Sequence, residues 1–515
     1  MFAVVSCAAG VIATVNCVGD DASVNTGTTV TPEAGGGGTE AGGGTDSSTA
    51  ADSATACGAP TTDFYVDVKG ADTNLGGGAG CAFKTITKAL AASATHYNAT
   101  IHLAAGSYGA GETFPLVVDQ GRSLVGAGDT MTTIAGSSSG FNTKDTASSF
   151  DEIDGGGAKY FITILAGDVI GGPNSLGATT LSGFTVRPAS SVTMPTANHV
   201  GIACIAGNGP NTGSTPPLPP ANLVVKGLTI GPNFDHGVSI GSSPTKSIGC
   251  NASIIASTFL TANIGLGTGV CGMTNPASSW PSAQVGDGTA GNANTFKGTT
   301  MGIFAQGCGA VQLFAGNHFV SGHRGIVTGV NTAQYLEITS NTFDGATAPN
   351  MAIGIHTNPG AILHKLNDNV FSNISHNAET DVESGDTSGY AIKFSGQHIL
   401  EARRNSIHDN DNGLYLGTAV GADFDFSGAS AQNDRNQFYC NSNAAGGTGY
   451  DVILGYAGGA NTAKFTGNAW DHASPAPYGN LASANGTDVV TAGGAIDTSN
   501  PHQLVGLACA AGRVP

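Results

Sequence analysis

Residues Asn294–Phe319 read NTFKGTTMGIFAQGCGAVQLFAGNHF, and this stretch decides the fold of the chain. It begins and ends with an Asn-x-Phe unit, and a glycine followed by alternating apolar residues lies between the two units. Alternation with a period of two is typical of short β-strands. The stretch is therefore a candidate for one turn of a repeating structure.

The unit of asparagine, any residue and an aromatic or apolar residue recurs along the second half of the chain. Successive asparagines are separated by 23, 24, 28, 36, 31 and 32 residues: Asn294, Asn317, Asn341, Asn369, Asn405, Asn436 and Asn468. Interleaved with them are glycines followed by alternating apolar residues, such as Gly302-Ile-Phe and Gly325-Ile-Val. Repeats of 20-odd residues with two or three strands each indicate a solenoid. The shortest spacings exclude β-propeller blades, which need about 40 residues, and leucine is too sparse for leucine-rich repeats.

The sequence thus predicts an all-β fold, a parallel β-helix of about ten to thirteen coils stacked about 4.8 Å apart. The longer spacings fit the same coil with an inserted loop, since insertions at turns leave a stacked core intact. Equivalent side chains of stacked coils form columns, so we expect Phe296 and Phe319 to stack in the core. We expect the asparagines to lie at the turns, where asparagine tolerates left-handed backbone, and to form a hydrogen-bonded ladder.

Composition and charge narrow the class of protein. The 515 residues include 79 glycines, only 10% are charged, and the net charge is −18 with no cluster of Lys or Arg. Nucleic acid is therefore not an expected partner, because phosphates would meet no local basic surface. A multispanning membrane protein and collagen are excluded by the absence of long apolar runs and of a Gly-X-Y period. An acidic polysaccharide would be repelled unless Ca²⁺ bridged the two surfaces.

The N-terminal residues predict export. Residues 1–17 contain a short apolar segment that ends at Cys17, and residues 18–62 are rich in Gly, Thr, Ala and Ser. The first segment is an export signal or a lipoprotein signal with Cys17 as the lipidation candidate, although no basic residue precedes it. The second has the composition of a disordered tether. A membrane contact is expected only through such a lipid anchor, and the chain is expected outside the cytoplasm, secreted or at the cell surface.

Eight cysteines lie beyond the apolar segment, and none forms a Cys-x-x-Cys pair. An even number in an exported chain favours disulfides over zinc or redox motifs. Proximity in sequence suggests four disulfide pairs: Cys57–Cys81, Cys204–Cys250, Cys271–Cys308 and Cys440–Cys509. The alternative is that these cysteines are buried free thiols.

The folded part is expected to span residues 63–515, with an N-terminal module over 63–136 and repeat coils with a C-terminal cap over 137–515. A short amphipathic helix near Thr85–Ala92, with Thr85 as its N-cap, is expected to cover the open end of the core. Several short motifs occur in order across the module, including Phe83-Lys-Thr-Ile, Ala105-Gly-x-Tyr and Phe114-Pro-Leu. This ordered set resembles the domain of unknown function that begins right-handed parallel β-helices of the pectin-lyase-like superfamily. The resemblance implies a right-handed, single-stranded β-helix and no particular activity.

The stretch NFDHGVSIGSS (Asn233–Ser243) resembles a motif of polygalacturonases, which are inverting glycosidases on this fold. It makes Asp235 and His236 catalytic candidates, since such hydrolysis needs one carboxylate as acid and another to activate water. The family's upstream acidic motifs and downstream Arg-Ile-Lys are missing here. Similar turns recur at Ser321–Gly329 and Asp409–Gly417, which favours coil architecture over catalysis.

A lyase would need a base and a Ca²⁺ beside the uronate carboxylate. Candidate bases are His323 with Arg324, or His364 with Lys365. Candidate calcium ligands fall in three acidic clusters: Asp151/Glu152/Asp154, Asp381/Glu383/Asp386 and Asp409/Asp411. The alternative is that each cluster is simply a solvated polar loop. The sequence predicts no required cofactor, and it is compatible with bound calcium.

A binding role competes with catalysis. The residues two positions after the repeated glycine are expected to face outward, and Phe304, His356 and Tyr415 among them are candidate sugar contacts. Because no complete catalytic set is visible, the sequence favours a non-catalytic surface module that binds a polysaccharide or cell-surface glycan. A polysaccharide lyase or glycoside hydrolase, and a passive structural spacer, are the alternatives on the same fold. Oligomeric state is not predicted.

Overall fold

The computed structural model describes the chain from Cys57 onward, with gaps. The described residues are 57–119, 121–136, 161–167, 177–189, 199–205, 221–241, 250–261, 263–268, 282–305, 311–328, 335–358, 360–376, 389–396, 398–417, 423–428, 434–441, 449–455, 462–471, 477–478, 488–491, 494–507 and 509. All of them belong to one compact unit, Ala54–Pro515. The predicted signal, most of the tether, and the candidates Cys17, Asp151 and Asp154 lie outside the described residues.

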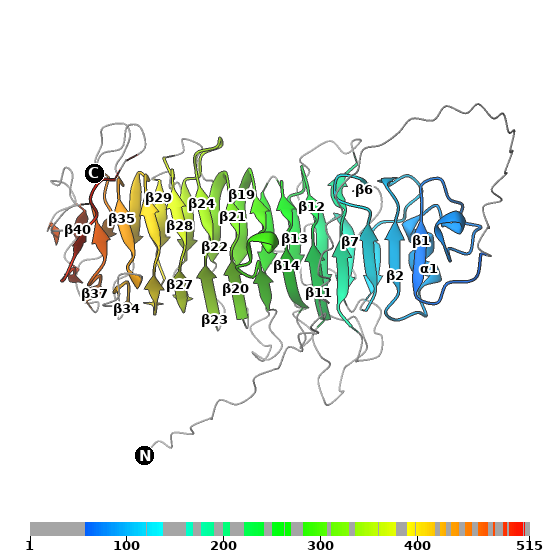
Figure 1. The fold of residues 1–515 in the computed structure, drawn as a ribbon, viewed down its shortest axis with the longest axis horizontal. Coiled ribbons are helices and arrows are strands. Elements are labelled where there is room, and N and C mark those ends of the chain that lie inside the picture. The colour runs from blue at the N-terminus through cyan, green and yellow to red at the C-terminus, as the bar shows by residue number, and fades with distance from the viewer. Residues whose placement is uncertain are drawn as a thin grey trace, which may run out of the picture. The chain divides into compact units, whose positions relative to one another are not determined.

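Three large parallel sheets make up most of this unit, and most coils contribute one strand to each of them in turn (Figure 1). Sheet A has eleven strands: β1 (Asp63–Val66), β2 (Thr100–Leu103), β5 (Ser123–Gly126), β8 (Thr179–Ser182), β11 (Ala221–Lys226), β14 (Cys250–Ile255), β17 (Ala283–Val285), β20 (Val311–Ala315), β23 (Tyr335–Thr339), β27 (Lys365–Asn367) and β31 (Ala402–Arg403).

Sheet B has thirteen short strands that carry the Asn-x-Phe aromatic residues. They are β3 (Gly106–Tyr108), β6 (Thr132–Gly136), β9 (Thr185–Pro188), β12 (Thr229–Ile230), β15 (Thr258–Phe259), β18 (Thr295–Phe296), β21 (His318–Phe319), β24 (Thr342–Asp344), β28 (Val370–Ser372), β32 (Ser406–His408), β35 (Gln437–Tyr439), β38 (Ala469–Trp470) and β42 (His502–Gln503).

Sheet C also has thirteen strands and carries the glycine series. They are β4 (Leu116–Asp119), β7 (Phe161–Gly167), β10 (His199–Ile205), β13 (His236–Ile240), β16 (Ile264–Thr268), β19 (Thr299–Ala305), β22 (Gly322–Thr328), β25 (Ile353–Thr357), β29 (Tyr390–Phe394), β33 (Asn412–Leu416), β36 (Val452–Leu454), β40 (Val489–Thr491) and β39 (Pro477–Tyr478).

Two small sheets complete the strands: β26 (Ile362–Leu363), β30 (His398–Ile399) and β34 (Asp423–Phe424), and β37 (Ala463–Lys464) with β41 (Ile496–Asp497). With the exception of β39, which lies beyond β40, the strands of the three large sheets follow chain order along the stack (Figure 1). The fold is the predicted right-handed parallel β-helix. No described helix is long and apolar enough to span a membrane.

The core is a column of stacked rings, as the Asn-x-Phe units predict. Ring centroids of Phe259, Phe296, Phe319, Phe343 and Phe371 follow one another at 4.5 to 4.9 Å, nearly parallel. Beside this column runs the glycine series, and the reason for glycine is steric. A Cβ on the glycine at position 325 would lie 2.5 Å from a Phe343 ring carbon and 2.6 Å from the carbonyl oxygen of the next coil's glycine. The two repeated motifs therefore require each other.

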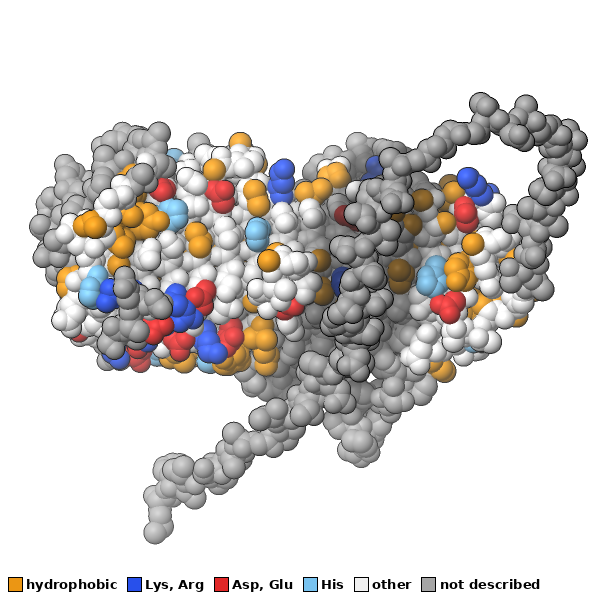
Figure 2. All heavy atoms as spheres, in the orientation of Figure 1, with side chains coloured by type: hydrophobic (Ala, Val, Ile, Leu, Met, Phe, Trp, Pro, Cys, Tyr) orange, Lys and Arg blue, Asp and Glu red, His pale blue; other side chains and the backbone are white. Residues whose placement is uncertain are grey.

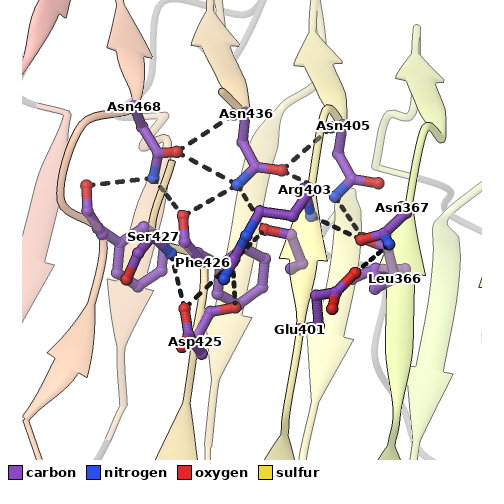
Figure 3. A network of polar contacts seen from close by, with 12 residues as sticks. Leu366, Asn367, Glu401, Arg403, Asn405, Asp425, Phe426, Ser427, Asn436 and Asn468 are labelled. Carbon is purple, nitrogen blue, oxygen red and sulfur yellow. Dashed lines mark hydrogen bonds and ion pairs between the residues drawn. The ribbon is translucent and has the colours of Figure 1, made fainter. Parts of the chain in front are cut away.

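The asparagines form a continuous, fully buried ladder. Each Nδ2 donates to Oδ1 of the next asparagine from Asn294 to Asn468, over 2.8 to 3.2 Å. Each also donates to a backbone carbonyl of another coil, as Asn405 does to Leu366, and Figure 3 shows the last three rungs. Buried amides are thereby satisfied, which burial requires. The ladder begins at Ser257, whose backbone N–H donates to Asn294.

One detail of the expected turns is wrong. The left-handed backbone belongs to the residue before the asparagine, which has φ of 57° at Ser340, 61° at Asp368 and 56° at Arg404. That residue turns the chain, so the asparagine that follows can point inward and bond along the stack. A second ladder, which the sequence did not predict, joins Asn410 to Asn441 and then Asn441 to Asp451.

The N-terminal end is covered as predicted. Helix α1 (Ile86–Ala92) begins after Thr85, whose side chain accepts from the N–H of Lys88, and Ile86, Ala89 and Leu90 are buried against the first coil. Short 3₁₀ turns occur at η1 (Ala79–Cys81) and η5 (Ala290–Asn292).

Three of the four expected disulfides are present: Cys57–Cys81, Cys204–Cys250 and Cys440–Cys509. The last of these ties the final described segment to an earlier coil. Cys271 and Cys308 lie outside the described residues. Such disulfides are typical of proteins that fold in an oxidising, extracytoplasmic environment.

Candidate functional site

The outer face of sheet C carries most of the candidate residues in two columns. Apolar residues such as Val238 and Ile303 point into the main core, whereas Ile264, Met301 and Val327 form a separate cluster on the outside. Strand pairing aligns one outer column, His236, Ile264, Met301, Arg324, Ile353, Tyr390 and Asn412. It aligns a second, Ser239, Gly267, Phe304, Val327, His356, Lys393 and Tyr415. Phe304, His356 and Tyr415 therefore do share one column.

The four catalytic candidates lie on this face but in two groups. Asp235 and His236 stand at the start of β13, whereas His323 and Arg324 belong to β22, three strands further along. At about 4.8 Å per strand, some 14 Å separate the two groups. They do not form one reaction centre, although a single extended ligand could contact both.

Asp235 is the centre of the first group. Its Oδ2 lies 3.3 Å from Nε2 of His236, and its Oδ1 accepts from Nδ2 of Asn263 over 3.2 Å. His199 heads the neighbouring strand β10, one position from the residue that pairs with His236, and feels the Asp235 charge. Asp235 thus contacts one imidazole and a carboxamide, and a second imidazole, that of His199, lies within range of its charge.

Both imidazoles of this group are buried on the outside of the sheet, with 4% of His199 and 1% of His236 exposed. Burial lowers the pKa of His199, and the Asp235 charge opposes that change. A neutral imidazole held beside a carboxylate can accept a proton, with the carboxylate fixing its orientation. Buried ionisable side chains with a shifted pKa and a charged partner are functional-site candidates.

His199 was missed by the sequence reasoning, although a signal for it exists. It lies two residues before Gly201, as Asp235 lies two before Gly237 and Asn263 two before Gly265. Aligning the coils on this glycine would have placed the three side chains on neighbouring strands.

The middle of the face is apolar, and the far half is basic and aromatic. Phe304 packs against the cluster of Ile264, Met301 and Val327. Beyond it Arg324 is buried, and the second column continues through His356 and Lys393 to Tyr415, whose ring lies 5.4 Å from that of Tyr390.

The other proposed bases belong to a different face. On the outside of sheet A, Lys365 Nζ lies 2.6 Å from Glu337, Tyr335 also bonds to Glu337, and the ring of His364 lies 4.7 Å from that of Tyr335. Ion pairs continue along this side through Arg403–Asp425 and Arg404–Asp368. Acidic and basic side chains accordingly gather together over the C-terminal coils (Figures 2 and 3). Mutually neutralised pairs of this kind are typical of a stacked surface rather than of a catalytic base.

The calcium candidates that can be placed are already engaged. Asp409 Oδ2 lies 2.8 Å from Nδ1 of His408, and Asp411 Oδ2 accepts from the backbone N–H of His376. The described carboxylates that converge within 4.8 Å are instead Asp451, Asp471 and Asp488, in the last coils. Burial and the two neighbouring carboxylates raise the pKa of Asp451 well above its usual value. Oxygen ligands of this type suit Ca²⁺, and a bound cation would have to displace the proton that the raised pKa of Asp451 favours.

Comparison with known proteins gives one family match. A family described as a protein of unknown function (DUF1565) matches residues 68–279, about two fifths of the chain and well beyond the resemblance over 63–136. No match was found among curated protein sequences.

Similar solved structures include the A-module of the mannuronan C-5 epimerase AlgE6 from Azotobacter vinelandii, at 14% identity over 82% of this chain and 91% of that one, with a TM-score of 0.32. A GH136 lacto-N-biosidase from Eubacterium ramulus shows 12% identity over 86% and 68%, with a TM-score of 0.40. A rhamnogalacturonan lyase shows 12% over 86% and 90%, with a TM-score of 0.36. At these identities and TM-scores the three structures carry no conclusion about what this chain does.

Proposed function

We propose that this chain is an exported β-helix protein that binds a polysaccharide along the outer face of sheet C. The observation that carries the proposal is the aligned second column, in which His356, Lys393 and Tyr415 lie on successive coils and Phe304 lies two coils before His356, with Val327 between them. Aromatic rings and cations at regular spacing suit a ligand that is itself a repeating chain. The three disulfides favour export.

The charges of this face favour an acidic polysaccharide. The whole chain has a net charge of −18, yet the far half of the face carries the partly exposed Lys393 together with Arg324 and His356, which are buried in the same face. A guanidinium can bind a carboxylate through two parallel hydrogen bonds. A uronate-containing chain could therefore bind here without the calcium bridge that the overall charge would otherwise require.

Binding is tested by titrating the full chain with acidic polysaccharides, polygalacturonate and alginate, and with neutral ones of similar length. Lys393→Gln should weaken binding of the acidic chains about tenfold, and increasing salt should do the same. Lys88→Gln, on the exposed side of α1, is the matched control and should bind as the wild type does. Equal affinity for neutral and acidic chains in all three proteins would contradict the proposed face.

A second function, proton abstraction from a bound uronate, is favoured by one observation. Asp235 lies between His236 and Asn263 and acts electrostatically on His199. Hydrolysis needs two carboxylates, whereas the contacts described around His236 and Asn263 include only the carboxylate of Asp235. In a lyase reaction an imidazole would take the proton from the carbon beside the carboxylate, and the electron pair would form a C=C bond as the leaving oxygen departs with its sugar.

Absorbance of unsaturated uronate products separates this second function from binding alone. If the group is catalytic, His199→Gln and Asp235→Asn should each lower product formation at least a hundredfold while leaving affinity within about threefold. His318→Gln, an exposed histidine of sheet B, is the matched control. No product from any acidic polysaccharide, together with retained binding, would leave the chain as a binding protein.

A further inference from the structure

A cleft of about 260 Å³ opens between α1 and β4, at the first coils of the stack. Its walls are mostly apolar and include Leu90, Ala91, Pro115, Leu116 and Val117. Leu90 and Leu116 are buried at its floor, whereas Ala91 is exposed at its rim. The cleft is therefore open to solvent and lined by fixed side chains of the helix and the strand.

One charged side chain lines this apolar cleft. Arg122 is only 3% exposed, and its Nη2 donates to the carbonyl oxygen of Ala94 over 2.9 Å. Its Nε has no hydrogen-bond partner. Leaving a buried donor without a partner is unfavourable. This N–H has almost no accessible surface, so a ligand in the cleft would respond to the charge of the guanidinium.

Asp119, on β4, is the acidic group that faces this arginine. Burial lowers the pKa of Arg122, and the Asp119 charge opposes that change, so the guanidinium stays protonated. Because Asp119 also offsets part of the positive charge, an anion would bind here with modest affinity only.

We infer that this cleft binds a small carboxylate with a compact apolar body, such as one aromatic ring, whose carboxylate is attracted by the positive charge of the Arg122 guanidinium. The size fits, since a buried apolar cavity of about 150 Å³ in another protein holds benzene. The ring would contact Leu90, Pro115 and Leu116, and the rim at Ala91 would leave room for entry.

This site is independent of the proposed glycan face, although both belong to sheet C. Val117 pairs with Leu165, which pairs with Ala203, which pairs with Ser239. The cleft thus lies three strands, some 14 Å, before Ser239 along the same outer column. Loss of glycan binding in the Lys393 variant and loss of carboxylate binding in a cleft variant would be separate results.

The probe is phenylacetate, titrated into the full chain and followed by ligand-observed NMR and calorimetry. We expect a Kd on the order of 1 mM, and at least tenfold weaker binding of phenylacetamide, which has the same shape without the charge. Arg122→Met should lose at least tenfold in affinity. Arg187→Met, an exposed arginine outside the cleft, should bind as the wild type does.

A second variant keeps the test decisive if Arg122→Met does not fold. Ala91→Leu places a larger side chain at the rim of the cleft on an exposed helix position, so the fold should persist while phenylacetate binding falls at least tenfold. Circular dichroism and the thermal midpoint report folding of each variant. Phenylacetate binding that is absent at about 20 mM, or that survives unchanged in Ala91→Leu, would overturn the inference.

Discussion

The central coils and the last coils differ in the residue that occupies the glycine position of sheet C. In the central coils, from Gly237 to Phe371, a glycine on sheet C lies against the phenylalanine stack. In the last coils the residues aligned after Gly413 are Asp451 and Asp488, one position before the paired Val452 and Val489. A position that tolerates no Cβ in one region therefore holds a buried carboxylate in the other. Close packing decides which residue this position accepts in the central coils, whereas electrostatic repulsion decides the stability of the last coils.

The largest effect should come from adding a single methyl group in the central coils. Gly325→Ala places a Cβ 2.5 Å from the Phe343 ring and 2.6 Å from the next coil's backbone oxygen, and neither neighbour can move without shifting the stack. We expect a loss of about 3 kcal/mol in the free energy of unfolding, measured by denaturant titration. Gly291→Ala, where nothing lies within 4 Å, should change it by less than about 1 kcal/mol. Similar losses in both variants would show that close packing is not the reason for glycine.

Removing one rung of the ladder should cost nearly as much. Asn341 accepts from the N–H and Nδ2 of Asn317 and donates to Phe314 and Asn369. Asn341→Ala leaves several buried groups without partners, each worth about 1–3 kcal/mol, so we expect a loss of roughly 3 kcal/mol. Asn350→Ala, at an exposed position, should stay within about 0.5 kcal/mol. A small effect at Asn341 would mean that water enters the ladder.

The last coils should respond to pH instead. The pKa of Asp451 is raised in the folded state, so its stabilising contribution is full below the unfolded pKa of about 4 and is lost as pH rises through the folded value. Asp451→Asn can still accept from Asn441 and removes the charge. Thermal midpoints of wild type and variant should therefore match near pH 4, and the variant should be the more stable at pH 7.

Calcium separates repulsion from metal binding at this cluster. With EDTA the advantage of Asp451→Asn at pH 7 should persist, because Asp471 and Asp488 still repel a third charge. If millimolar Ca²⁺ stabilises the wild type and not the variant, the carboxylates bind the cation, and mass action then gives its affinity. Asp497→Asn on β41 is the matched control and should show neither effect.

Sequence reasoning succeeded where one residue type recurs over several successive coils. Phenylalanine in the stack, asparagine in the ladder and glycine beside them repeat because each has a steric or hydrogen-bonding reason that recurs. The left-handed turn residue was misassigned because Ser340, Asp368 and Arg404 share a backbone conformation and no side-chain type. The Asp235 group was only half seen, since His199 lies 36 residues earlier in a stretch without the Asn-x-Phe unit.

The smallest change in the free energy of unfolding should come from Arg404, the residue before Asn405 of the asparagine ladder. Arg404 binds Asp368 through two hydrogen bonds of 2.6 and 2.7 Å and also reaches Asp434, yet these side chains are more than a third exposed. Such surface pairs contribute about 0–1 kcal/mol, and salt weakens them. Arg404→Gln should therefore lower the free energy of unfolding by less than about 1 kcal/mol, and by less still in 1 M NaCl. Asn405→Ala, one residue further and buried, should cost several times more, because its amide bonds have no water to replace them.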